Sequence, residues 1–227
     1  MAARRKADLE GPTLFGEGSA ALLPQHSESV EAPPDDSLGR VLDDLRSNHA
    51  CGACPGGTPV IFGEGPARAD LMVVGEGPAP DDAHTGLPFS GPAGQLLTRM
   101  LDAIGSPRPG TYICNVIKCI PPGERAFAVD EIGACRPLLL RQILAVGPRV
   151  IFAAGALAAQ TLLRSRQSIS DLRGRRYLLR LNGRAIDLVP SYNPAFLLRV
   201  PEKKREAWAD LKLVRERLAA APEPPRT

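Results

Sequence analysis

The cysteines are the residues of this chain whose spacing most directly suggests chemistry. Cys51 and Cys54 form a C-x-x-C pair, and Cys119 and Cys135 follow much later. A C-x-x-C presents two thiolates from one turn, which suits a tetrahedral sulfur site. Spacing alone leaves zinc and an iron–sulfur cluster as equal alternatives, because both accept four cysteine ligands. The fifth cysteine, Cys114, stands between apolar residues and is expected to be a small buried side chain.

A second candidate site is the loop that follows the apolar stretch 71–74. It begins Gly75-Glu76-Gly77-Pro78, continues through Asp81 and Asp82, and ends at Leu87-Pro88-Phe89. A loop of this length between two firm elements is more often functional than idle. A dinucleotide site is disfavoured, because Pro80 stands where that motif needs its third glycine. What remains is a glycine turn that exposes backbone N–H groups on either side of a carboxylate.

Alternating strands and helices are predicted to position these residues. Strands are expected at 71–74, 112–117 and 150–153, and helices at 93–104, 129–145 and 156–163. A hairpin around Asn182-Gly183 and a closing helix at 202–220 complete the pattern. We therefore predict a three-layer α/β/α fold with a central, mainly parallel, roughly four-stranded sheet. In such folds, ligands bind outside the carboxyl ends of the strands.

Length and composition indicate one domain with tails. The chain has 227 residues, enough for one good core. Residues 1–36, rich in Gly, Pro, Ser, Glu and Ala, are expected to form a disordered tail, residues 37–220 a single domain, and residues 221–227 a second tail. The net charge of +3 permits a nucleic-acid partner without demanding one. Because no apolar run approaches the roughly 18 residues that span a bilayer and no secretory signal is visible, a cytoplasmic location is expected.

Taken together and in order, these segments resemble the family 4 uracil-DNA glycosylases, which carry a [4Fe-4S] cluster. Residues 75–97, GEGPAPDDAHTGLPFSGPAGQLL, are similar to the first motif of that family. Residues 112–122, YICNVIKCIPP, are similar to its central strand segment. The resemblance runs from about residue 51 to residue 218. It implies that Cys51, Cys54, Cys119 and Cys135 hold the cluster in a structural role, and it gives Cys114 no ligand role.

The resemblance also implies roles for residues of the first motif and the central strand. Phe89 would stack on a uracil base, and Asn115 would pair with its O4 and N3 through the carboxamide. Glu76, Gly77 and Pro78 would line the pocket, with Glu76 placed to help position water. The implied protein is a monomer that flips uracil out of single- or double-stranded DNA, hydrolyses its N-glycosidic bond and leaves an abasic site.

The second motif departs from the family pattern. Family 4 has His-Pro where this chain has Asn193-Pro194. The amide of Asn193 can donate to uracil O2 but cannot carry charge, and charge-assisted hydrogen bonds are roughly twice as strong. Gly77 stands where the most active families carry a water-activating Asp, but the members of family 4 also do without it, so this position is not a departure. We therefore expect Asn193 and Glu76 to be the catalytic residues of a slow enzyme, and the alternative is a catalytically weak protein that binds uracil or another lesion in DNA.

Overall fold

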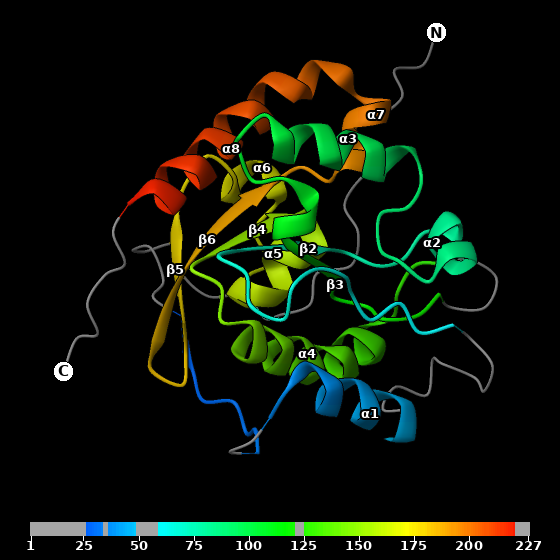
Figure 1. Ribbon diagram of the computed structural model, residues 1–227. Coiled ribbons are helices and arrows are strands. Elements are labelled where there is room, and N and C mark those ends of the chain that lie inside the picture. Colours follow the sequence, from blue (N-terminus) through cyan, green and yellow to red (C-terminus); the bar gives the residue numbers. More distant parts are fainter. Residues whose placement is uncertain (1–25, 34–35, 49–58, 121–124, 221–227) are drawn as a thin grey trace, which may run out of the picture.

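A six-stranded sheet between two layers of helices is built by the residues that the computed structural model describes, which are 26–33, 36–48, 59–120 and 125–220 (Figure 1). The strands are β1 His26–Glu28, β2 Leu71–Gly75, β3 Tyr112–Asn115, β4 Val150–Ala154, β5 Tyr177–Leu181 and β6 Arg184–Ser191. Their order across the sheet is β1-β5-β6-β4-β2-β3, and every neighbouring pair is parallel except β5 and β6. Strands β2, β3 and β4 are buried along their whole length, which explains why they read as continuous apolar runs.

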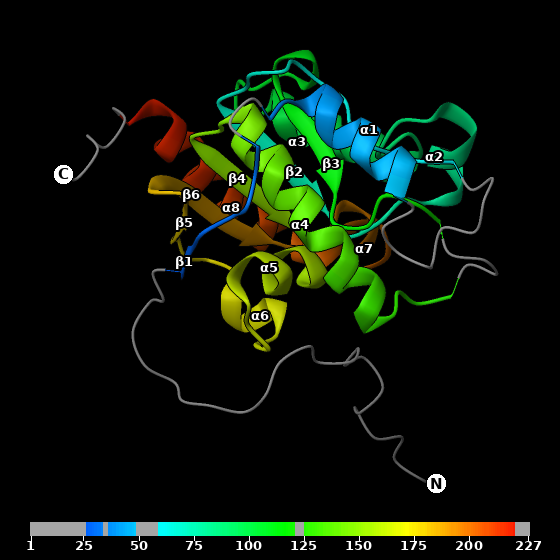
Figure 2. The same cartoon turned by 90° about the horizontal axis from the view of Figure 1, so that it is seen from below.

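Helices cover both faces of this sheet. They are α1 Leu38–Asn48, α2 Pro80–Thr85, α3 Pro92–Asp102, α4 Val129–Val146, α5 Ala156–Leu163, α6 Ile169–Leu172, α7 Pro194–Arg199 and α8 Lys204–Ala219, with single 3₁₀ turns at Arg108–Gly110 and Pro201–Lys203. One face packs on α4, α5 and α6, and the other packs on α3, α7 and α8. Helix α1 lies outside α4, as the view from below shows (Figure 2). No helix among the described residues has the length and apolar character needed to cross a membrane.

The predicted three-layer fold is confirmed, but the sheet is larger than the roughly four strands expected. Strand β1 lies inside the segment 1–36 that composition assigned to a tail, and it pairs with β5 in parallel. An edge strand of this kind needs backbone hydrogen bonds rather than an apolar pattern, so its sequence, HSE, gave no signal. The ordered domain therefore begins before residue 37, whereas residues 1–25 and 221–227 lie outside the described residues.

The predicted hairpin is confirmed at Asn182-Gly183. Both residues have positive φ angles, 46° and 79°, as a two-residue type I′ turn requires. The Asn182 carboxamide also pairs with the backbone of Val30, accepting from its N–H at 2.7 Å and donating to its carbonyl at 3.1 Å. The turn thus fixes the chain that leaves β1.

Candidate functional site

Loops after three strands meet around one small cavity at the carboxyl edge of the sheet. The cavity has a volume of about 120 Å³, and its walls include Gly77 after β2, Asn115 at the end of β3 and Asn193 after β6. Phe89, Ala195 and the residues that begin α2 and α3 complete it. Because these strands run parallel, their carboxyl ends lie at one edge, where such folds place ligands. The volume suits one small planar molecule rather than a whole nucleotide.

Asn115 presents an unpaired carboxamide inside this region. The residue is 1% exposed, and neither its Oδ1 nor its Nδ2 has a hydrogen-bond partner among the residues that the structure describes. Its backbone carbonyl, by contrast, accepts a hydrogen bond from the buried Lys118 Nζ at 2.6 Å. Buried side-chain amides are normally paired, so an orphan at a cavity indicates a ligand that offers both a donor and an acceptor.

Phe89 and Asn115 approach each other over Gly75. A Cβ added to Gly75 would lie 2.2 Å from Asn115 Oδ1 and 2.5 Å from Phe89 Cζ, so only glycine allows both side chains their positions. Phe89 itself has a φ of 55°, in the left-handed region that bulky residues rarely adopt. Backbone strain of this kind concentrates at functional sites, where the surrounding structure maintains it.

Glu76 and Asn193 join the first motif to the second. Asn193 Nδ2 donates to Glu76 Oε2 at 2.9 Å, and Asn193 Oδ1 accepts from the N–H of Ala195 at 2.9 Å as the N-cap of α7. Glu76 Oε1 accepts from the N–H of Leu157 at 3.0 Å in the first turn of α5, where negative charge is favoured. Gly155, with a φ of 120°, makes room, because a Cβ there would lie 2.5 Å from Glu76 Cδ. The amide orientation of Asn193 is thereby fixed, with one N–H of Nδ2 left over.

The structure brings most of the expected site residues together. Four of the six line the cavity: Gly77, Phe89, Asn115 and Asn193. Glu76 and Pro78 are not among the lining residues: Glu76 reaches the cavity through Asn193, and Pro78 is buried beside the turn.

Two contacts at this site were missed by reasoning from the sequence. Asp82 is 2% exposed in the short helix α2 and accepts from the N–H groups of Ala79 at 3.0 Å and Ser90 at 2.8 Å. Its place three residues after Ala79, the N3 position of a capping box, is the signal that could have revealed it. The ring of Phe127 lies against Gly77, where a Cβ would come within 2.1 Å of Phe127 Cζ. No sequence pattern pointed to that contact.

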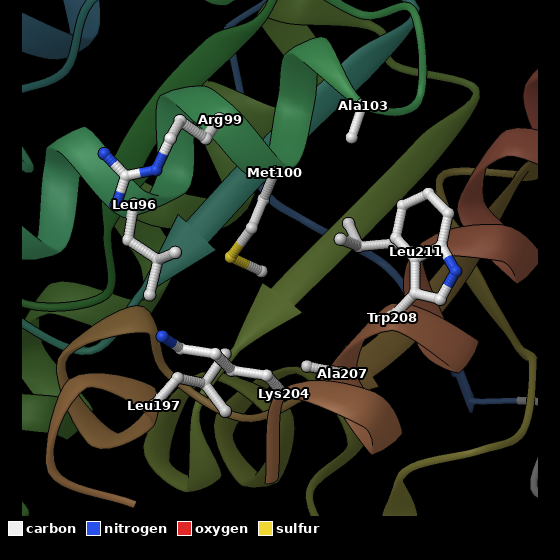
Figure 3. A pocket seen from close by; sticks show the side chains of 9 residues that line it. All are labelled: Leu96, Arg99, Met100, Ala103, Leu197, Lys204, Ala207, Trp208 and Leu211. Atoms are coloured by element: carbon white, nitrogen blue, oxygen red, sulfur yellow. The ribbon is translucent and has the colours of Figure 1, made fainter. Parts of the chain in front are cut away.

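The second motif continues into α7, whose apolar residues serve different purposes. The ring of Phe196 lies 5.1 Å from that of Tyr192, Leu197 is 1% exposed, and Leu198 is 40% exposed. Leu197 helps to line a separate apolar pocket of about 180 Å³ between α3 and α8, beside Met100 (Figure 3). Packing therefore fixes Leu197, and with it the helix that Asn193 caps, while Leu198 remains free for a partner.

Two of the four cysteines expected to bind metal lie among the described residues. Cys119 and Cys135 are each 1% exposed in one apolar cluster, whereas Cys51 and Cys54 lie outside the described residues. Val60 and Cys119 form an isolated antiparallel bridge beyond the end of β3, so the backbone of a residue that follows Cys54 closely in the sequence lies beside that of Cys119. Within the described ranges, no three His, Cys, Asp or Glu side chains gather as a metal site. Two buried soft donors nevertheless suit a sulfur-bound cluster.

Cys114 has the character expected of a core residue. It is fully buried in β3, and burial raises the pKa of its thiol. A protonated, enclosed thiol is a poor metal ligand.

Comparison with known proteins agrees with this architecture. A family model described as the uracil DNA glycosylase superfamily matches residues 62–212, which include β2 to β6 and every residue that lines the cavity. The chain belongs to the uracil-DNA glycosylase superfamily. Within that superfamily, similar proteins are the type-4 uracil-DNA glycosylases of Thermotoga maritima and Pyrobaculum aerophilum, 40% and 38% identical over 153 and 157 residues. These matches cover 66% and 67% of this chain and 78% and 80% of the relatives.

A third type-4 glycosylase, from Archaeoglobus fulgidus, is 34% identical over 185 residues, or 80% of this chain and 93% of that protein. The resemblance to family 4 that the motifs indicated is thus confirmed over most of the chain. Its members are uracil-DNA glycosylases by name.

Proposed function

We propose that this protein is a DNA-repair glycosylase that hydrolyses the N-glycosidic bond of uracil in DNA and leaves an abasic site. The observation that carries the proposal is the unpaired carboxamide of Asn115, buried at a base-sized cavity beside Phe89. The type-4 uracil-DNA glycosylases among its relatives support the same reaction.

Recognition of the base follows from the donors and acceptors that the cavity offers. A flipped uracil presents the O4 acceptor beside the N3–H donor, so Asn115 Nδ2 would donate to O4 and Asn115 Oδ1 would accept from N3. Cytosine reverses this pattern on the same edge. Phe89 would stack on the base, and Gly77 would face it without a side chain. The cavity thereby selects uracil by its edge and its planar shape.

Catalysis would depend mainly on stabilising the leaving base. As the bond between N1 and C1′ breaks, the electron pair moves to the uracil ring and negative charge gathers at O2. The remaining N–H of Asn193 would donate to O2, and the hydrogen bond to Glu76 would hold that amide in place. Losing one such donor typically costs about two to three orders of magnitude in rate. The carboxylate of Glu76 would hold the water whose oxygen bonds to C1′, and the proton that this water loses would end on the released uracil anion.

Contact with DNA would involve the surface beside the second motif. Leu198 is the exposed apolar residue of α7 and would enter the helix where the base leaves. Arg199, Lys204 and Arg205 are exposed next to it and would contact phosphates. The DNA would be single- or double-stranded.

We also propose that Cys51, Cys54, Cys119 and Cys135 hold a [4Fe-4S] cluster. When bound, the cluster would supply a structural link between the amino-terminal segment and the core that contains β3 and α4, with no part in the hydrolysis. The burial of Cys119 and Cys135 in one apolar cluster supports this role. The enzyme would act as a monomer in the cytoplasm.

A second candidate function is a catalytically weak protein that binds uracil or another lesion in DNA. Asn193 favours it, because a neutral amide stands where the resemblance to family 4 leads us to expect a histidine. Single-turnover measurements on a uracil-containing oligonucleotide, with enzyme in excess, separate the two. Release of uracil with formation of an abasic site supports the glycosylase. Tight binding of the oligonucleotide without an abasic site identifies the binding protein.

A further inference from the structure

Hydrogen bonds to the backbone of both neighbouring residues, Pro88 and Ser90, hold the strained backbone of Phe89 in place. On the carboxyl side, the N–H of Ser90 donates to Asp82 Oδ1 at 2.8 Å. On the amino side, the carbonyl of Pro88 accepts a hydrogen bond from Arg108 Nη2 at 2.7 Å. Arg108 belongs to the 3₁₀ turn before β3 and is distant from the first motif in sequence. Nothing in the motif pattern indicates this second contact.

Arg108 is itself anchored at two further points. The same Nη2 pairs with the carboxylate of Glu64, and Nη1 donates to Thr98 Oγ1 of α3 at 3.4 Å. Glu64 cannot drift, because its backbone exchanges hydrogen bonds of 2.9 and 2.8 Å with Ile113 of β3. The guanidinium of Arg108 therefore fixes the position of the Pro88 carbonyl relative to β3, the strand that ends at Asn115.

We propose that Arg108 is a positioning residue for base recognition, which keeps the ring of Phe89 beside the Asn115 carboxamide. The inference rests on the proposed function, since it concerns how the same cavity receives uracil. Without Arg108, the peptide between Pro88 and Phe89 is free to turn, and Phe89 relaxes toward negative φ, the region that bulky residues prefer. The ring then leaves the cavity wall, and the base loses its stacking partner.

The competing explanation is that Arg108 only stabilises the fold through its ion pair with Glu64. The chain offers a matched control for that possibility. Arg141 of α4 pairs with Asp36 and Asp44, and its side chain is 13% exposed compared with 21% for Arg108. Arg141 lines no part of the cavity. Arg141→Met therefore removes two ion pairs of an arginine of similar burial without touching Phe89.

The test compares Arg108→Met and Arg141→Met in two measurements on the full chain: thermal unfolding, and the affinity for a uracil-containing oligonucleotide divided by that for the undamaged one. We expect both variants to unfold at lower temperature, but only Arg108→Met to lose uracil preference, by about tenfold, the factor that one ordinary interaction supplies. Arg108→Lys keeps the positive charge and one donor nitrogen, so it should recover part of the uracil preference. It also serves as the second variant if the methionine variant does not fold.

A double-mutant comparison decides whether Arg108 acts through Phe89. In a Phe89→Leu background, Arg108→Met should cause little further loss, because residues that act through one another are not additive. The inference is overturned if the two losses add in full, or if Arg108→Met keeps the uracil preference of the wild type. Failure of the proposed function looks different, since the wild type itself would then neither prefer nor release uracil.

Discussion

The amide of Asn193 donates to the carboxylate of Glu76 across 2.9 Å, and this contact ties the two motifs into one site. We predict that Asn193→His accelerates uracil release by about one to two orders of magnitude, because a charged donor binds the developing charge at O2 more strongly. The adjacent carboxylate favours the charged imidazole. Single-turnover rates on a uracil oligonucleotide measure the effect, with Asn193→Ala as the slow control. A folded histidine variant that is no faster than wild type contradicts the assigned role of Asn193.

Asn115 should separate function from stability. Asn115→Leu replaces an unpaired buried amide by an apolar group of similar size, so the melting temperature should stay the same or rise. Uracil release should fall by at least about two orders of magnitude, because both edge hydrogen bonds are lost. Thermal unfolding and single-turnover kinetics on the same preparation test this pair of outcomes. A clear drop in stability would mean that the carboxamide has a partner within the folded protein.

Asn115→Asp addresses selectivity at the same position. A carboxylate offers acceptors only, so it cannot donate to O4, and discrimination between uracil and cytosine should weaken. Competition between a uracil-containing oligonucleotide and one with cytosine at the same position measures the discrimination. Unchanged preference would remove Asn115 from base recognition.

Gly75 should not tolerate even one methyl group. Gly75→Ala places a Cβ against Asn115 Oδ1 and the ring of Phe89, so we expect loss of uracil preference and a lower melting temperature. Gly133 in α4 is the matched control, because a Cβ there meets nothing within 4 Å. Gly133→Ala should stabilise the protein by roughly 0.5–1 kcal/mol. Similar behaviour of the two variants would show that the contact over Gly75 is unimportant.

Cluster binding can be tested with two cysteines of the same core. Cys135→Ala should lose iron, the broad visible absorbance and much of the thermal stability, whereas Cys114→Ala should retain the iron and the colour. Wild-type protein should be brown and should bleach on reduction or chelation. Metal analysis and absorbance spectra report the outcome, and a colourless protein that contains stoichiometric zinc rules the cluster out.

The ion pair between Arg141 and Asp36 should stabilise the protein at neutral pH and lose this effect in acid. The hydrogen bonds from Arg141 to Asp36, both 2.7 Å, hold the pKa of that carboxyl below its usual value of 3.8. A lowered folded-state pKa contributes stability that is present above the unfolded value and is lost as the pH falls through the folded one. Asp36→Asn should therefore reduce the free energy of unfolding at pH 7 by about 1.5–3 kcal/mol. The difference in the free energy of unfolding between the two proteins should shrink as the pH falls below about 3.8 and disappear below the lowered pKa of Asp36. A difference that does not shrink with falling pH would assign the stability to another contact.

The apolar runs explain why so much of the fold could be predicted. Val73 and Ile151 lie in strands that are buried on both faces, so their sequences stay apolar throughout and stand out. His26 lies in an edge strand that pairs through its backbone, and α2 begins from a capping interaction of Asp82 rather than an apolar stripe. Strand β1 and helix α2 were missed because neither element has an apolar run or stripe in its sequence.

The residues of the site also fall into those that the sequence could predict and those that only the fold reveals. Asn115 lies in the predicted strand 112–117, and Asn193 follows the second arm of the predicted hairpin. The resemblance to a family gave both residues roles that their places in the predicted elements alone do not specify. Arg108 and Phe127 act on the site from segments outside both motifs, through contacts that only the folded chain creates. Positions of this kind carry no local signal, because their importance depends on what another segment brings to them.

Gly155 shows what such positions mean for variation of this sequence. Strand β4 lies between the strands that carry Glu76 and Asn193, and its exit turn contributes empty space instead of a side chain. Any substitution there would push Glu76 off the start of α5 and pull the two motifs apart, although residue 155 touches no base. A library that randomises only the motif residues would never sample this constraint, whereas one that varies the turn after β4 would meet it first.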